Sequence, residues 1–162
     1  MLLRVLRAAV DADRDTVLSW RNHPEVRRVS LTTHVIDPSE HAAWWRTATA
    51  DPARRVLVYS GDDGVPAGVV IFDLRADPAT WSFYLDVDGL GGQLLPAWMR
   101  LEDEAVRYAF GELGLERLGG ETLAWNTPVL ALHRRFGFRE TRRYERQVDG
   151  TAQTVVWTER GK

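Results

Sequence analysis

The chain has 162 residues, a formal net charge of −2 and no cysteine. The length predicts one domain, residues 1–162, with a single core, and the small net charge argues against binding nucleic acid through the molecule as a whole. The missing cysteines exclude disulfides, a thiolate zinc site and a cysteine nucleophile, and no apolar run approaches the roughly 20 residues that would cross a bilayer, so we expect a globular, cytoplasmic protein.

The N-terminal half contains three predicted strands, over residues 3–6, 55–60 and 66–74. Two helical patterns separate the first two strands, over residues 11–29 and 37–50. Pro24 is expected to break the first helix, because proline inside a helix removes a hydrogen bond and clashes with the preceding turn. The second and third strands are predicted to form a hairpin around Gly61–Gly64.

The C-terminal half contains four further predicted strands, over residues 79–87, 118–125, 139–148 and 151–159. In the first of them the side chains alternate, so Trp81, Phe83 and Leu85 share one side. The last two strands flank Asp149-Gly150, the strongest short hairpin signal in the chain.

Two helices are predicted among these strands, over residues 94–113 and 128–136. Pro96 marks a candidate start for the first, although Gly91-Gly92 could begin it earlier. The complete order is strand, two helices, three strands, helix, strand, helix and two strands. This order predicts an α/β (α+β) fold in which helices cover both faces of one mixed sheet.

Residues 121–138 carry the strongest functional signal. A short apolar strand ends at Asn126, and Thr127-Pro128 then open a helix, as its cap and its first residue. This strand, tight turn and helix are expected to bring two titratable side chains, Glu121 and His133, toward one place.

The helix that follows is predicted to bury one stripe of side chains. Val129, Leu132 and Phe136 recur at helical spacing, which predicts that they face the core. His133 is expected at the edge of this stripe, and Gly137 is expected to end the helix.

The stretch from Asn126 through His133 to residues 136–138 (Phe-Gly-Phe) resembles the last sequence block of the GNAT superfamily of N-acetyltransferases. These enzymes move an acetyl group from acetyl-CoA to a primary amine. The branch that acetylates an amine on a nucleotide-linked sugar is most similar, because there a strand Glu precedes the helix residue by twelve positions, as Glu121 precedes His133. The family usually has tyrosine at the position of His133.

The resemblance covers nearly the whole chain, because the order of elements is also that of the family. It implies a mostly antiparallel sheet whose central strands splay apart and hold the pantetheine arm of acetyl-CoA between them. The cofactor contacts that it implies are the main chain of Tyr84, Leu85, Asp86 and Val87, a pyrophosphate site at Gly91, Gly92 and Gln93, and contacts from Asn126 and Phe136. The Leu85 amide would point at the thioester oxygen, and no metal is expected.

Glu121 and His133 suit the chemistry of this transfer. A carboxylate such as Glu121 can accept the proton that an ammonium must lose before it attacks. His133 could protonate the departing thiolate, act as a base, or only hydrogen-bond the thiol. The alternative is that Glu121 forms a structural ion pair with a nearby arginine, such as Arg134, and that His133 is an ordinary helix residue.

The resemblance places the acceptor pocket on the first two helices and the loop between them. Trp20-Arg21-Asn22 matches a stretch common in the branches that acetylate ribosomal-protein N-termini or amino sugars. Trp20 and Trp44 could stack on a sugar or base, and Arg21 could bind a phosphate. Simple packing of the helices on the sheet is the alternative, preferred for Trp44.

The sequence therefore predicts an acetyl-CoA-dependent N-acetyltransferase acting on a small-molecule amine, with an amino sugar, free or nucleotide-linked, as the leading acceptor. A protein N-terminus is the second hypothesis, and a non-catalytic acyl-CoA-binding protein of the same fold is the third. Dimers are common in the family, and the resemblance leaves a homodimer open.

Overall fold

The computed structural model describes residues 5–162, so part of the strand predicted over residues 3–6 lies outside the described residues. Within this range one sheet runs in the order β1-β2-β3-β4-β5-β7-β6. Its strands are β1 (Leu6–Ala8), β2 (Arg54–Ser60), β3 (Pro66–Asp73), β4 (Ala79–Leu85), β5 (Arg117–Leu123), β6 (Arg139–Val148) and β7 (Thr151–Gly161). Every neighbouring pair is antiparallel except β4 and β5, which are parallel.

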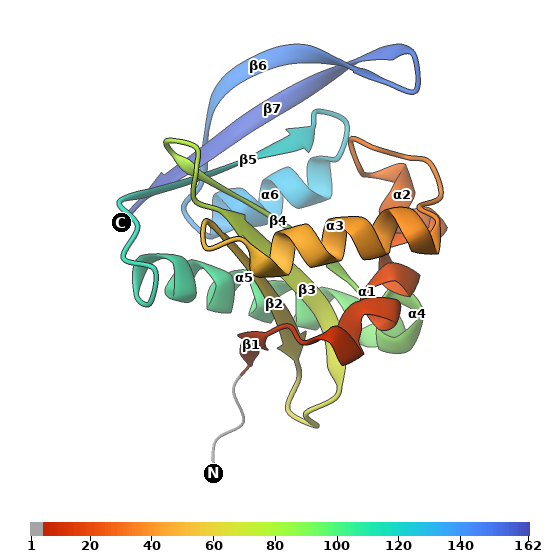
Figure 1. Ribbon diagram of the computed structural model, residues 1–162. Helices are drawn as coiled ribbons and strands as arrows, with labels where there is room; N and C mark the ends of the chain where they lie inside the picture. The colour runs from red at the N-terminus through yellow and green to blue at the C-terminus, as the bar shows by residue number, and fades with distance from the viewer. Residues whose placement is uncertain (1–4) are drawn as a thin grey trace.

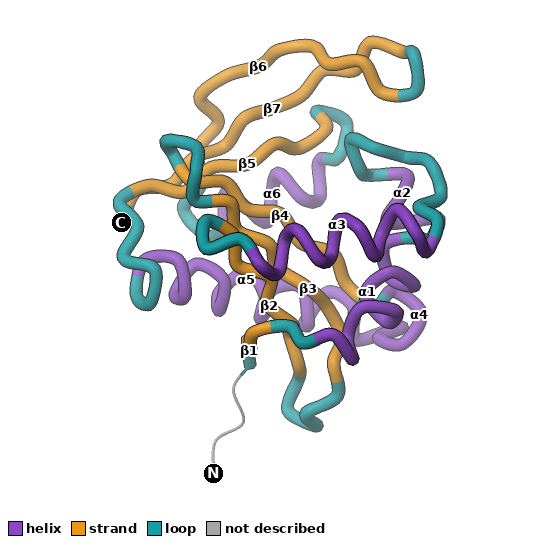
Figure 2. The backbone as a smooth tube through the Cα atoms, viewed as in Figure 1, coloured by secondary structure: helices purple, strands orange, loops and turns teal. Residues whose placement is uncertain are grey.

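Helices cover both faces of the sheet, as predicted (Figure 1). They are α1 (Arg14–Arg21), α2 (Pro24–Arg28), α3 (Pro38–Ala50), α4 (Val87–Leu90), α5 (Leu94–Phe110) and α6 (Thr127–Arg135). In the view of Figures 1 and 2, α1 and α3 lie in front of the sheet, whereas α5 and α6 lie behind it. We call these the front and rear faces. None of the helices within residues 5–162 combines the length and apolar character needed to span a membrane.

Each face has its own hydrophobic core. The front core joins α1 and α3 to the sheet through Val17, Trp20, Trp45, Ala48, Val56 and Val69. The larger rear core packs α5 against the sheet, and Leu101 and Phe72 are fully buried within it. Trp81, Phe83 and Leu85 belong to the rear core and Tyr84 packs on the front core, so the predicted alternation of β4 is confirmed.

The helix starts follow local hydrogen bonds. Asp37 caps α3, because its carboxylate accepts the N–H groups of Ser39 (2.7 Å) and Glu40 (3.2 Å). The predicted break at Pro24 is confirmed, since α1 ends at Arg21 and α2 begins at Pro24. His23 caps α2 by accepting the Glu25 N–H through Nδ1 at 3.1 Å.

The chain after β4 differs from the prediction. The strand stops at Leu85 instead of residue 87, because the Asp86 carboxylate accepts the Gly89 N–H (3.0 Å) and caps the short helix α4. A 3-10 turn, η2 (Gly91–Gln93), then leads into α5. This helix begins at Leu94, two residues before Pro96, which sits within its first turn.

The buried face of α6 differs from the one that the sequence predicted. Asn126, and not Thr127, occupies the cap position, so the helix begins one residue earlier than predicted. Its buried side chains are Leu130, Leu132 and His133, whereas Val129 and Phe136 are only partly buried. His133 therefore lies inside the apolar face of this helix instead of at its edge.

Truncation of Leu101 tests the rear core. Leu101→Ala should lower the free energy of unfolding by about 2–5 kcal/mol, because it removes buried methyl groups and leaves a cavity. Leu95→Ala is the matched control in the same helix, since Leu95 is 60% exposed, and it should change stability by less than about 0.5 kcal/mol. Denaturant titration measures both, and equal losses would contradict this packing.

Candidate active site

β4 and β5 are joined only at one end. They pair at Ala79↔Leu118 and Thr80↔Gly119, and beyond these positions each strand follows its other neighbour. β4 stays paired with β3 as far as Leu85, while β5 stays paired with β7 as far as Leu123. The predicted splay of the central strands is therefore present, as a gap that opens toward the carboxyl ends of β4 and β5.

The edge of β4 presents main-chain groups to this gap. Successive residues of an antiparallel ladder turn their main chain alternately toward and away from the partner strand. The Asp86 N–H donates to the Ala67 carbonyl of β3 at 2.8 Å, so Leu85 directs its N–H away from β3 and toward the gap. Phe83 lies two residues earlier and shares this direction, so both residues can pair with an extended chain in the gap.

The four residues predicted to hold the pantetheine arm therefore differ in position. Leu85 lines the gap with its main chain, whereas Tyr84 and Asp86 turn theirs toward β3. The Tyr84 side chain lies on the front face, where burial raises its pKa well above the usual range. Val87 begins α4 beyond the end of the strand.

The glycine segment leads into α5 without an acidic residue in the first turn of that helix. Gly91 has a positive φ of 50°, and a side chain built on Gly91 or Gly92 would meet no atom within 4 Å. The two preceding aspartates are engaged elsewhere: Asp86 caps α4, and Asp88 contacts His23 Nε2 at 3.0 Å. The Gly91 N–H is engaged at the end of α4, because it donates to the Val87 carbonyl. The amides that follow it at the start of α5, with open space beside Gly92, can receive a phosphate.

His133 lies behind the gap and bonds to a buried carboxylate. Its Nδ1 is 2.5 Å from Oε1 of Glu102 on α5, and the two side chains are 7% and 0% exposed. Aromatic rings enclose the imidazole, with centroid distances of 5.3 Å to Trp81, 6.1 Å to Phe83 and 5.6 Å to Phe138. Because Trp81 and Phe83 belong to the unpaired part of β4, His133 sits where β4 and β5 separate.

Glu121 has different partners, on the hairpin of β6 and β7. Its carboxylate accepts the Tyr144 hydroxyl at 2.5 Å and Nη1 of Arg146 at 2.7 Å. The arginine partner is thus Arg146, not one of the arginines near His133. Desolvation, and then the hydrogen bond to Glu121, raise the pKa of Tyr144 to about 12.

Glu121 and His133 are not brought together as the sequence pattern predicted. Leu118 belongs to the rear core, so Glu121, three residues further along β5, projects to the front face. His133 bonds to α5 on the rear face. The two side chains therefore flank the gap from opposite faces of the sheet.

Glu102 was not identified from the sequence. It lies four residues after Trp98 and four before Val106, so it interrupts the apolar stripe of α5. A carboxylate at a core position of an amphipathic helix was the available signal, because such a group is rarely buried without a partner.

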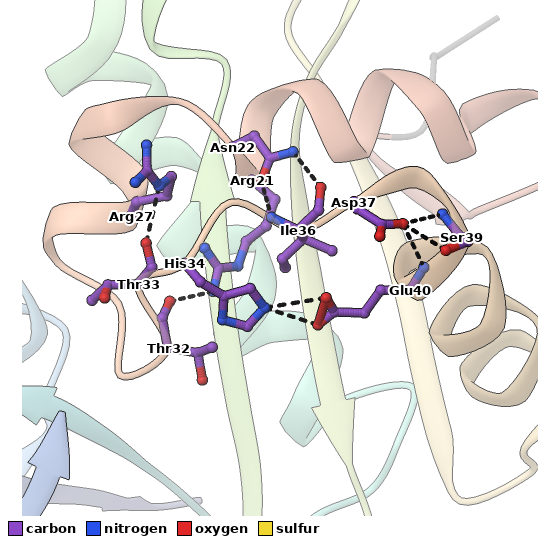
Figure 3. A network of polar contacts seen from close by, with 10 residues as sticks. All are labelled: Arg21, Asn22, Arg27, Thr32, Thr33, His34, Ile36, Asp37, Ser39 and Glu40. Carbon is purple, nitrogen blue, oxygen red and sulfur yellow. Dashed lines mark hydrogen bonds and ion pairs between the residues drawn. The ribbon is translucent and has the colours of Figure 1, made fainter. Parts of the chain in front are cut away.

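The segment after α1 organises the front wall of the site (Figure 3). Asn22 bonds to both main-chain groups of Ile36, each at 2.8 Å, so it fixes the loop between α2 and α3. Arg21 donates through Nη2 to the Thr32 carbonyl at 2.7 Å, while its buried Nη1 has no partner within residues 5–162. Burial lowers the pKa of the Arg21 guanidinium.

The two tryptophans predicted to bind the acceptor are packed. Trp20 is only 5% exposed in the front core, so it supports the wall and offers little surface to a ligand. The Trp44 ring lies tilted against His41 and edge-on to Trp45. An exposed indole that the prediction omitted, Trp125, follows β5 and lies under the Arg28 guanidinium at 5.0 Å.

The remaining predicted cofactor residues border α6. Asn126 is buried, and its carbonyl accepts the Leu130 N–H at 3.2 Å. Phe136 is half-buried and lines a surface hollow near Arg160, beside the paired end of β5. No group of three or more His, Asp or Glu side chains within the described residues is arranged to hold a metal.

Comparison with known proteins identifies relatives of this fold. Residues 4–139 match the family model of an acetyltransferase (GNAT) domain. The spermidine N-acetyltransferase of Vibrio cholerae in complex with CoA and spermine superposes with a TM-score of 0.82 at 18% identity, over 95% of this chain and 92% of that one. A candidate phosphinothricin N-acetyltransferase gives 0.79 at 23% identity, over 96% of each chain.

A GNAT-family acetyltransferase from Bacillus anthracis also superposes, with a TM-score of 0.77 at 11% identity, over 96% of this chain and 93% of that one. At these identities the likeness shows the fold. A comparison with curated protein sequences finds no match.

Alkaline titration tests the environment of Glu121. Burial raises the pKa of Tyr59 and Tyr84, and Tyr144 reaches about 12, so the folded chain should form tyrosinate later than the unfolded chain, whose tyrosines ionise near pH 10. Because folding favours the neutral phenols, this stabilisation is complete below about pH 10 and is lost as the pH rises through the raised values.

Near-ultraviolet absorbance of tyrosinate measures this difference between native and guanidinium-unfolded protein. Glu121→Gln should lower the pKa of Tyr144, because the phenol loses a carboxylate acceptor. Tyr144→Phe should remove that component of the titration altogether. Identical titrations of the wild type and Glu121→Gln would contradict the Tyr144–Glu121 bond.

Proposed function

Because the chain belongs to the GNAT family of acetyltransferases, we propose that it transfers an acetyl group directly from acetyl-CoA to the amine of a nucleotide-linked amino sugar. Family membership makes the chain an acetyl-CoA-dependent N-acetyltransferase. The acceptor and the roles of individual residues are the proposal. The observation that carries it is the gap between β4 and β5, flanked by Glu121 on the front face and His133 on the rear face.

The residues around the gap fit acetyl-CoA. Leu85 and Phe83 offer main-chain groups to the pantetheine arm. We assign the pyrophosphate to the segment of Gly91, Gly92 and Gln93 ahead of α5, where Gly91 leaves open space and its own N–H donates to the Val87 carbonyl. We also assign Asn126, which follows the carboxyl end of β5, to the cofactor side. Phe136 lies beside the paired end of β5, away from the open end of the gap, so its predicted cofactor contact is not retained. When bound, acetyl-CoA supplies the acetyl group as a reactive thioester.

We assign one proton transfer to each face of the sheet. Glu121 accepts a proton from the acceptor ammonium, directly or through a water, which frees the nitrogen lone pair for attack. The Leu85 N–H donates to the carbonyl oxygen as negative charge develops there, and one such donor contributes about 3 kcal/mol. His133 donates a proton to the departing sulfur, so a C–N bond forms as the C–S bond breaks.

An anionic acceptor is favoured by the charge of the front wall. Within residues 5–162 Arg21 forms no ion pair with a carboxylate; its charge interacts at longer range with Tyr84, on the front face of β4 beside the gap, and with Glu40. A partly buried cation without a partner is costly, and a substrate phosphate would supply that partner. Trp125 is 43% exposed and has the Arg28 guanidinium over one face of its ring, so a sugar or base would stack on the other face.

The same charge disfavours a polyamine. Arg21 and Arg27 both donate to loop carbonyls instead of carboxylates, and the carboxylate of the same network, Glu40, contacts His34. The two arginines would therefore repel a cationic acceptor such as spermidine. A protein N-terminus is the second candidate, because the side-chain order Trp20-Arg21-Asn22 also occurs in that branch.

An acceptor panel tests the proposed function. Acetyl-CoA should raise the melting temperature, and CoA release should be fastest with a nucleotide-linked amino sugar, slower with the free sugar and slowest with spermidine. Because the chain has no cysteine, a thiol reagent detects only the CoA that is released. Turnover with peptides alone would establish the second candidate, and absence of acetyl-CoA binding would indicate a non-catalytic protein.

Substitution of the two flanking residues tests their roles. His133→Gln and Glu121→Gln should each lower kcat roughly 10²- to 10⁴-fold, because each removes a proton-transfer group. Glu140→Gln is the control, since Glu140 forms an exposed pair with Arg143 on the same hairpin as Tyr144. Steady-state kinetics across pH measure all three, and rates equal to that of the control would reject these roles.

A further inference from the structure

We propose that Glu102 is a positioning residue that fixes the tautomer and orientation of His133, so that Nε2 is the ring nitrogen presented to the reacting groups. This inference rests on the proposed function, because it assigns the partner through which His133 acts. The observation behind it is the buried contact of 2.5 Å between Glu102 Oε1 and His133 Nδ1.

Packing does not explain a carboxylate at this position. Glu102 is fully buried on the apolar face of α5, where Leu101, Ala105 and Val106 join the rear core. Its Oε2 is also buried and has no hydrogen-bond partner within residues 5–162. Burial of a carboxylate costs several kcal/mol, and an apolar residue of similar size usually serves stability as well or better. The hydrogen bond with His133 is therefore the feature that a carboxylate adds here.

The contact determines which ring nitrogen carries the proton. We take Glu102 as a carboxylate, which only accepts hydrogen bonds, so that Nδ1 is the donor of this contact. Nε2 is then an acceptor in the neutral ring and a donor in the protonated ring, and it has no hydrogen bond to any residue from 5 to 162. A carboxylate behind a histidine fixes the tautomer and ring orientation in this way and stabilises the charged ring.

The other residues that the structure describes around the imidazole carry no charge that could fix its tautomer. Trp81 and Phe83 on β4 and Phe138 at the start of β6 enclose the imidazole, and all three are uncharged. On its own helix, the neighbouring cation Arg134 is exposed to solvent. Within the described residues, Glu102 is thus the charged group in hydrogen-bond contact with the ring.

The need for such a partner follows from the residue type. Histidine has two ring nitrogens, and only one of them can face the reaction. The contact with Glu102 decides which of the two it is.

Nitrogen NMR tests the tautomer without any acceptor. Long-range ¹H–¹⁵N spectra should show His133 Nδ1 protonated in the wild type, with the signals assigned by their loss in His133→Gln. In Glu102→Leu, which keeps an apolar group in the stripe, the neutral ring should change to the Nε2–H tautomer that an unrestrained imidazole prefers. An unprotonated Nδ1 in the wild type, or the same tautomer in Glu102→Leu, would overturn the proposal.

A double-mutant cycle separates positioning from structural support. Glu102→Gln keeps the shape and a carbonyl acceptor, so it should fold and lower kcat roughly 10- to 100-fold with little change in KM for acetyl-CoA. In a His133→Gln background the same change should lower kcat less than twofold, because Glu102 acts through the imidazole. Glu104→Gln, on the same helix, is the control and should keep kcat within twofold.

Equal losses in both backgrounds would show a structural role and overturn the inference. The kinetic cycle uses the best acceptor from the amine panel. Should no amine be acetylated, the proposed function fails, whereas the NMR result still decides whether Glu102 holds the tautomer.

Discussion

The incomplete pairing of β4 and β5 is the constraint on which the site depends. On its outer side each strand is hydrogen-bonded to another neighbour: β4 pairs with β3, and β5 pairs with β7. Their parallel contact is confined to Ala79↔Leu118 and Thr80↔Gly119, and beyond it the two main chains diverge. The rear of this opening is occupied by Trp81, Phe83 and His133. The sheet is therefore continuous at the paired end, while main-chain amides of β4 remain unpaired at the open end.

This divergence also places the two proposed proton-transfer groups on opposite faces of the sheet. The rear face supplies the buried pair of Glu102 and His133, which aromatic rings enclose. The front face supplies Glu121, held by Tyr144 and Arg146, and a wall with the cation Arg21. A gap through the sheet is the geometry in which groups on opposite faces can act on one substrate carbonyl, because a chain lying in the gap is reached from both sides.

Much of the architecture was predictable, because local patterns decide it. Pro24 broke the first helix, Asp37 capped the second and Asp149-Gly150 turned the final hairpin. The errors arose where side-chain hydrogen bonds compete with periodicity. Asp86 ended β4 early by capping α4, and the cap at Asn126 shifted the start of α6. The family resemblance supplied the splay, which residue types alone do not encode.

The sequence by itself determined the order of the elements and the two-sided coverage of the sheet, because these follow from periodicity and turn chemistry. It also singled out Glu121 and His133 as candidates through their spacing. Only the tertiary structure decided which groups those two residues meet. Glu102 is 31 positions from His133 and Tyr144 is 23 from Glu121, and neither distance has a local signature. Such pairs form when helix packing and strand register bring distant segments together, so the partners of a titratable side chain are a property of the folded chain.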